Sequence, residues 1–172
     1  MKIEPALMAE HSKKQTLFIA KAILNSKADI KELIQLYTGE DQVLAQRAAW
    51  VLSTVASAKP QLILPFLKKI IKHLNKDGLH DAVLRNGVKI LETLDLPKNQ
   101  LGEITDLCFK ILADQKQAIA TRCYAMTTLC KICSIEPELK TELRLVIEEF
   151  LPFASAGFRS RSKRTLLELE RL

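Results

Sequence analysis

Arginine recurs along this chain at an almost constant interval, and that interval is the strongest constraint on its fold. Arg47, Arg85, Arg122 and Arg161 lie 38, 37 and 39 residues apart. Each falls in a segment whose apolar residues recur every three to four positions, which is the spacing of an amphipathic helix. A period of about 38 residues that contains two helices is typical of stacked helical repeats.

Prolines mark the other helix of each repeat, because Pro60, Pro97 and Pro137 stand where helices begin and lie 37 and 40 residues apart. Aromatic residues make up only 5% of the chain, which favours helix over a β-sandwich. The pattern predicts nine helices with short loops, over residues 12–25, 26–39, 41–58, 61–75, 79–94, 99–113, 117–135, 138–153 and 158–171. Short loops force consecutive helices to pack antiparallel. We therefore predict an all-α chain, arranged as a right-handed α-α superhelix.

The domain organisation follows from the same period. We expect a loose tail over residues 1–11 and a single solenoid domain over residues 12–172, in which a half-unit at 12–25 precedes about four helix pairs. Ser12 with Gln15 fits a capping box at the start of this half-unit, whose apolar face carries Leu17, Ala20, Ile23 and Leu24. No apolar run reaches the ~20 residues that span a membrane. The first residues lack the apolar core of a signal peptide, so we expect a cytoplasmic protein whose four cysteines are reduced.

Residues 28–172 resemble HEAT repeats, within the broad HEAT/armadillo superfamily. Asp41 stands six residues before Arg47, and Ala48-Ala49 follows, which resembles the second helix of a HEAT repeat. Pro65 resembles the proline of a HEAT first helix. The resemblance implies an α-solenoid and a ladder of Asp–Arg pairs that includes Asp41 and Arg47. Such repeats serve many partners, so the fold alone does not name a function.

Later repeats depart from the acidic position of this pattern. Six residues before Arg122 stands Lys116, a base in the place of an acid. Six residues before Arg161 stands Ser155, which is also not an acid. The Asp–Arg ladder that the resemblance implies therefore does not extend to these two arginines.

The sequence lacks the motifs of common enzymes. It has no Gly-rich phosphate loop and no evident Ser-His-Asp or Cys-His grouping. The three histidines fall in the tail, on a basic helix face and at a turn; they are His11, His73 and His80. We therefore predict a protein that is not an enzyme and carries no cofactor.

Three cysteines share one face of the predicted helix 117–135, namely Cys123, Cys130 and Cys133. A zinc site needs four converging ligands, and no second CxxC or histidine pair accompanies these. A redox pair needs a helix N-terminus to lower the thiol pKa, whereas these residues lie in the middle and late parts of the helix. We interpret them as small thiols packed between helices, with no bound metal.

The net charge of +6 is unevenly distributed. Four lysines share one arc of the predicted helix 61–75 or follow it: Lys68, Lys69, Lys72 and Lys76. A second basic cluster lies on the last helix, with Arg159, Arg161 and Arg164. Each cluster is either an ordinary solvated face or a surface that attracts phosphates or an acidic protein. Five glutamates between residues 136 and 149 disfavour a uniformly basic nucleic-acid binder.

The second helices of the repeats carry a further candidate surface. Trp50, the single tryptophan, shares a flank with Arg47. Outward faces of two later helices carry Arg85 with Lys89, and Tyr124 with Thr128 and Lys131. If second helices line a concave side, these residues form a groove in which Trp50 anchors a partner. The alternative is that Trp50 packs between repeats.

We therefore predict a HEAT-like interaction or scaffold module that binds a protein partner through its concave or basic surface. The alternative is a nucleic-acid-binding protein, a relative of HEAT-like DNA glycosylases among the options, that uses Lys68–Lys76 and Arg159–Arg164. A third hypothesis is self-association through the last helix, which ends in Leu166, Leu167, Leu169 and Leu172.

Overall fold

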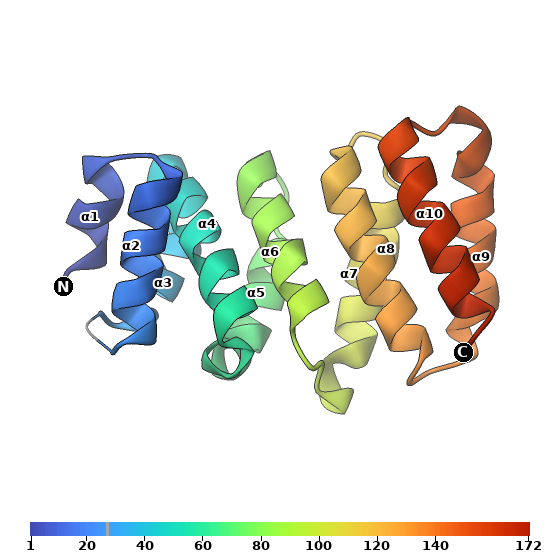
Figure 1. Ribbon diagram of the computed structural model, residues 1–172, viewed down its shortest axis with the longest axis horizontal. Helices are drawn as coiled ribbons and strands as arrows, with labels where there is room; N and C mark the ends of the chain where they lie inside the picture. Colours follow the sequence, from blue (N-terminus) through green and yellow to red (C-terminus); the bar gives the residue numbers. More distant parts are fainter. Residues whose placement is uncertain (27) are drawn as a thin grey trace. The chain divides into compact units, whose positions relative to one another are not determined.

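The structure is a computed structural model that describes residues 1–26 and 28–172, and these residues form helices and turns but no strand. The all-α prediction is confirmed. Lys27, inside the predicted helix 26–39, lies outside the described residues. The chain forms two compact units, Met1–Asp95 and Leu96–Leu172, each built from helices (Figure 1). That residues 12–172 act as a single domain stays a prediction.

Unit 1 contains α1 (Ile3–Ala9), α2 (Lys13–Leu24), α3 (Ile30–Tyr37), α4 (Gln42–Ala58), α5 (Leu67–Leu74) and α6 (Asp81–Thr93). Two 3₁₀ turns, η1 (Pro60–Leu62) and η2 (Leu64–Phe66), replace the first part of the predicted helix 61–75. Pro60 is the first residue of η1 and Pro65 the second residue of η2. Proline is tolerated at these positions because its missing amide hydrogen costs little in a first turn. Within this unit α2, α4 and α6 form one layer, with α3 and α5 behind it (Figure 1).

Helix α4 is the centre of unit 1, because it packs against α1, α2, α3 and α6. Its N-cap is Asp41, whose Oδ1 accepts a hydrogen bond from the Leu44 amide at 2.9 Å. The buried residues of α4 are mostly small: Ala45, Ala48, Ala49, Val51, Leu52, Ser53, Val55 and Ala56. Alanine lets neighbouring helices approach closely while it keeps the highest helix propensity.

The predicted tail at residues 1–11 is wrong, because Ile3–Ala9 forms α1 and buries Ile3 and Leu7. Seven residues with no side-chain cap of their own are too few to form a stable isolated helix. Later segments supply the missing bonds. Glu32 Oε1 accepts from the amide of Ile3 at 2.7 Å, and Arg47 Nη1 donates to the carbonyl oxygen of Leu7 at 2.7 Å.

We expect the substitution Glu32→Ala to release α1 from unit 1, because it leaves the first amides of α1 without an acceptor. Hydrogen exchange of the α1 amides should become about tenfold faster or more, while that of α4 changes little. Glu40→Ala removes an exposed glutamate elsewhere in unit 1 and is the matched control. Unchanged exchange in α1 would show that burial of Ile3 and Leu7 suffices without the cap.

Gly87 of α6 lies where two large side chains approach the helix. A Cβ atom at this position would collide with the Leu74 side chain and the Tyr37 hydroxyl. Tyr37 and Leu74 are both buried, so neither has open space into which it can move. The close packing of α6 against these side chains therefore requires glycine.

We expect Gly87→Ala to lower the free energy of unfolding by about 1–3 kcal/mol, as overpacking of a filled core commonly does. Gly102→Ala is the matched control, because a Cβ at Gly102 of α7 meets no atom within 4 Å. That control should be neutral or stabilising by up to about 1 kcal/mol, since alanine favours helix. Denaturant unfolding of both variants measures the difference.

Unit 2 contains α7 (Leu101–Ala113), α8 (Ile119–Cys133), α9 (Leu139–Phe150) and α10 (Ala156–Leu169), with the 3₁₀ turns η3 (Lys98–Gln100) and η4 (Leu151–Phe153). Helix α8 packs against α7, α9 and α10. Helix α10 begins at Ala156, before the predicted residue 158, because the Ser155 hydroxyl accepts from the Phe158 amide at 3.3 Å. In the described part of the chain, no helix is long and apolar enough to cross a membrane.

Candidate interaction surfaces

Trp50 lies half-buried on α4 and borders a hollow in unit 1. The ring of His11 meets the indole edge-on, with ring centroids 5.7 Å apart and planes at 84°. A hollow of about 230 Å³ is lined by His11, Gln46, Trp50, Ala82, Arg85 and Asn86. We name it the Trp50 hollow. His11, predicted to lie in a loose tail, therefore contributes to a surface.

Beside the Trp50 hollow, buried polar side chains form hydrogen bonds between α4 and α6. Ser53 Oγ lies 3.0 Å from both the Trp50 carbonyl oxygen and Asn86 Oδ1. Asn86 Nδ2 donates to the Ala82 carbonyl oxygen at 2.8 Å. Because a buried polar pair is costly to separate, these bonds fix the register of α4 against α6 below the indole.

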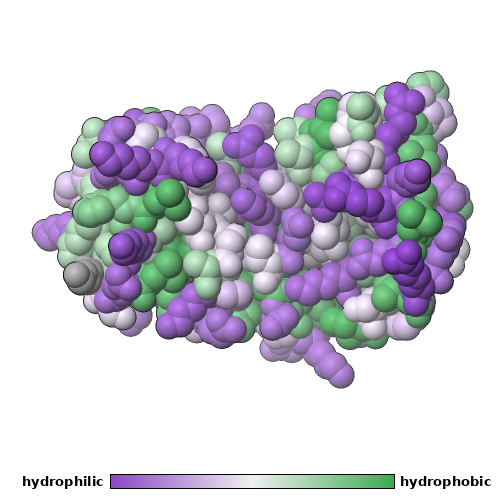
Figure 2. All heavy atoms as spheres, viewed as in Figure 1, coloured by the Kyte–Doolittle hydropathy of each residue, from purple (hydrophilic) through white to green (hydrophobic). Residues whose placement is uncertain are grey.

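Arg85 lines this hollow, and Lys89 follows it one helical turn later on α6. Arg85 is exposed and Lys89 half-exposed on α6. Within residues 1–26 and 28–172 neither side chain forms an ion pair. In the same layer, Leu17 and Phe18 of α2 are 49% and 58% exposed, and Figure 2 shows apolar surface over α2. The helical pattern placed Leu17 inward; the structure instead buries Thr16, Ile19, Ala20 and Ile23.

Arg47 is not a free groove residue, although the sequence placed it beside Trp50. Its guanidinium donates to the carbonyl oxygens of Leu7 and Met8, at the C-terminus of α1. Asp41 caps α4 and makes no ion pair with Arg47 in the described chain. The implied Asp41–Arg47 pair is therefore absent, because each group satisfies the backbone of a helix end.

The lysine strip lies on α5, which belongs to the other layer of unit 1, and on the residues directly after this helix. All four of its lysines are exposed, and none forms an ion pair among the residues described: Lys68, Lys69, Lys72 and Lys76. The opposite side of α5 buries Ile70, Ile71, His73 and Leu74. His73 was expected at the basic surface but is buried beside Tyr37, with ring centroids 5.0 Å apart.

Burial lowers the pKa of His73 below its ordinary value of 6.5, and the charges of Lys76 and Lys69 lower it further. The unfolded chain therefore takes up this proton at a higher pH than the folded chain. As pH falls below 6.5, proton uptake by the unfolded chain reduces stability.

We expect His73→Leu to make the stability of the protein less sensitive to acid. Wild-type free energy of unfolding should fall between pH 7 and pH 5 by more than that of the variant, which has no group to protonate here. Lys69→Gln keeps His73 but removes one repelling charge, so it should show an intermediate loss. Equal losses in all three proteins would contradict a role for His73.

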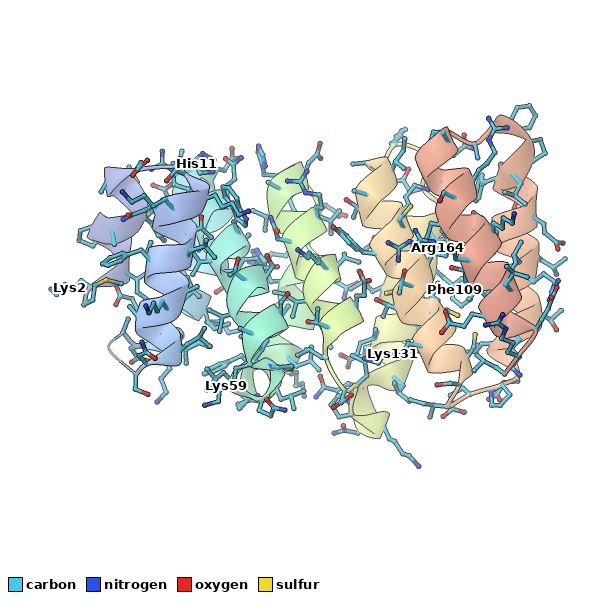
Figure 3. All side chains as sticks on the ribbon, viewed as in Figure 1. Lys2, His11, Lys59, Phe109, Lys131 and Arg164 are labelled. Carbon is cyan, nitrogen blue, oxygen red and sulfur yellow. The ribbon has the colours of Figure 1, made fainter. Side chains whose placement is uncertain are left out.

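The predicted surface residues of unit 2 divide into two groups. Tyr124 and Lys131 are half-exposed on α8, whereas Thr128, which the pattern placed between them, is fully buried. Arg159 and Arg164 are exposed on α10. Figure 3 shows Lys131 and Arg164 on these two helices.

Arg161 does not add a free charge to this surface. Its Nη1 donates to Thr127 Oγ1 at 2.5 Å and joins α10 to α8. Of the leucines at the end of the last helix, Leu169 is buried, while Leu167 and Leu172 are exposed. Self-association through these two leucines stays a prediction.

Arg122 of α8 forms a site that the sequence analysis missed. Only 8% of this residue is exposed, and its Nε donates to the Leu112 carbonyl oxygen at 2.8 Å. The rings of Phe150 and Phe158 lie against the guanidinium, with centroids 4.5 Å and 4.6 Å from Cζ. Burial lowers the pKa of Arg122 from its ordinary value, which shows that its charge is poorly solvated.

A hollow of about 400 Å³ opens beside this arginine. Its lining combines apolar rings with a few polar groups: Gln115, Ile119, Arg122, Glu149, Phe150, Phe153, Ala154, Ser155 and Phe158. We name it the Arg122 hollow. The sequence held one signal for it, because Lys116 stands where the repeat pattern has an acid, and this leaves Arg122 without the expected carboxylate.

All four cysteines are buried thiols. Burial raises the pKa of Cys108 and Cys130 to about 12 and that of Cys133 to about 11. Such thiols stay protonated at neutral pH and are poor nucleophiles. In the described residues no three His, Cys, Asp or Glu side chains cluster as metal ligands would.

The chain matches a known family of repeat proteins. Residues 3–169 match the HEAT repeat domain. The chain belongs to the HEAT repeat domain family. The match begins at α1, in agreement with its inclusion in unit 1. No curated protein and no solved structure matches the chain. The chain is therefore a helical repeat scaffold.

Proposed function

We propose that this HEAT repeat protein is a non-catalytic interaction module, and that unit 1 binds an acidic segment of a protein partner at the Trp50 hollow. The observation that carries the proposal is a half-buried tryptophan beside Arg85, with Lys89 one turn further along α6. Neither basic residue has an acidic partner in the described chain. Tryptophan and arginine dominate the energetics of many protein interfaces.

The chemistry of the partner follows from this surface. Acidic side chains complement Arg85 and Lys89, and apolar side chains complement the indole of Trp50. Phe18 and Leu17 extend the apolar area over α2. The bonds of Ser53 and Asn86 hold the floor of the hollow, so little ordering is needed when a partner binds.

Nucleic-acid binding by the lysine strip is the second candidate function. Four exposed lysines without acidic partners give the strip a local positive field. The strip lies on α5, whereas the Trp50 hollow lies on α4 and α6. Substitutions can therefore separate the two functions.

The test uses the fluorescence of Trp50, the single tryptophan of the chain. The probe is an amidated peptide that alternates Asp or Glu with Leu or Phe, compared with a peptide in which lysine replaces each acid. We expect the acidic peptide to change the emission of Trp50. The double variant Arg85→Glu with Lys89→Glu should weaken binding about tenfold or more, and calorimetry should show a similar loss for Trp50→Ala.

Lys69→Glu with Lys72→Glu is the matched control, since it reverses two charges on α5 and leaves the hollow intact. Equal binding of the acidic and the basic peptide, or indifference to the Arg85 and Lys89 changes, would contradict the proposal. Tight binding of duplex DNA with a steep salt dependence, abolished only by the α5 variant, would instead support the second candidate.

A further inference from the structure

The guanidinium of Arg122 lacks partners that its burial requires. Arginine carries five N–H donors, and the Leu112 carbonyl accepts only the one on Nε. The two N–H groups of Nη2 are buried and have no acceptor among the described residues. Phe150 and Phe158 stabilise the charge through their faces but offer no lone pair. A largely buried cation without a counter-ion is costly, so an anion bound here would gain much.

Asp114, whose charge acts on Arg122, does not complete this site. Asp114 raises the pKa of Arg122 by its charge but forms no ion pair with it within the described chain. Its Oδ1 accepts from the Lys116 amide and its Oδ2 from Gln117 Nε2, both at 2.9 Å. Both carboxylate oxygens are thus held by the loop before α8, and Arg122 remains available.

We propose that the Arg122 hollow binds the C-terminal residue of a partner polypeptide, with its carboxylate on Arg122 and its apolar side chain against the phenylalanine rings. A planar carboxylate matches the paired N–H groups of a guanidinium. Ser155, the N-cap of α10, also lines the hollow, and the positive end of that helix favours an anion.

The walls of the hollow restrict the anion to a single charge on an apolar group. Glu149 is an exposed residue of the lining. Its negative charge repels a phosphate dianion or several adjacent acids more strongly than it repels a single carboxylate. Ile119, Phe150 and Phe158 offer apolar contact, and about 400 Å³ accommodates one large side chain with its carboxylate.

A polypeptide is favoured over a free small acid because the apolar surface continues beyond the hollow. Phe153 of η4 lines it yet is 93% exposed. Only an occupant that extends outward covers such a ring. The site lies wholly in unit 2, and the inference does not rest on the proposed use of unit 1.

The probe is the peptide acetyl-Gly-Ser-Gly-Leu-Phe with a free C-terminus, and its reference is the same peptide as the C-terminal amide. Calorimetry on the full chain should show micromolar to millimolar binding of the acid, with the amide about tenfold weaker or more. In NMR spectra of the full chain, the Arg122 Nε–H signal should shift with the acid alone.

Exposed positions provide variants that fold even if Arg122→Gln does not. Phe153→Ala should weaken the peptide about threefold or more by removing apolar contact. Glu149→Gln should strengthen it about twofold to threefold by removing repulsion, an effect that a merely structural arginine would not produce. Leu145→Ala, at an exposed residue of α9 outside the lining, should leave affinity unchanged.

Equal binding of acid and amide, or no response to Phe153→Ala and Glu149→Gln, would falsify the site. N-acetyl-phenylalanine that binds as tightly as the peptide would overturn the assignment to a polypeptide. Trp50→Ala should not alter binding of this peptide. A loss with that variant would place the peptide on unit 1 and so count against the Arg122 hollow.

Discussion

The structure of unit 1 depends on the burial of a single helix, α4. Its alanine-rich inner face lets α1, α2, α3 and α6 approach one backbone closely. Because so many neighbours share it, the position of α4 sets the position of each of them. The Trp50 hollow is a consequence, since it forms where the flank of α4 meets α6 and the bonds between Ser53 and Asn86 hold that contact.

The repeated arginines show how one sequence position acquires different roles. Arg47 and Arg122 both bond carbonyl groups at the ends of other helices, which a repeat structure must satisfy. Arg161 bonds a threonine of α8, and Arg85 stays at the surface. A regular spacing in sequence therefore marks equivalent places in the fold, while the neighbours at each place decide whether the charge caps a helix, crosses to another helix or faces a partner.

Much of the fold was predictable because it rests on local periodicity. Apolar spacing, proline positions and caps such as Asp41 and Ser12 act within a few residues, so they are readable from sequence. Helix α1 was not, because its caps come from Glu32 and Arg47 far along the chain. The exposure of Leu17 and Thr128 was predicted wrongly for a related reason. Helical spacing shows which residues share a face of the helix, but the neighbouring helices decide which residues at the edge of that face are buried.

The candidate sites were predictable only in part. The sequence by itself determined the residue types at the surface: one tryptophan among basic residues, a lysine strip, and an arginine, Arg122, in whose repeat Lys116 replaces the expected acid. Only the tertiary structure decided that Arg47 is bonded to α1 while Arg85 is not, and that Phe150 and Phe158 enclose Arg122 without supplying an acceptor. The physical reason is that solvation and hydrogen bonding of a charge depend on groups brought together from distant parts of the chain.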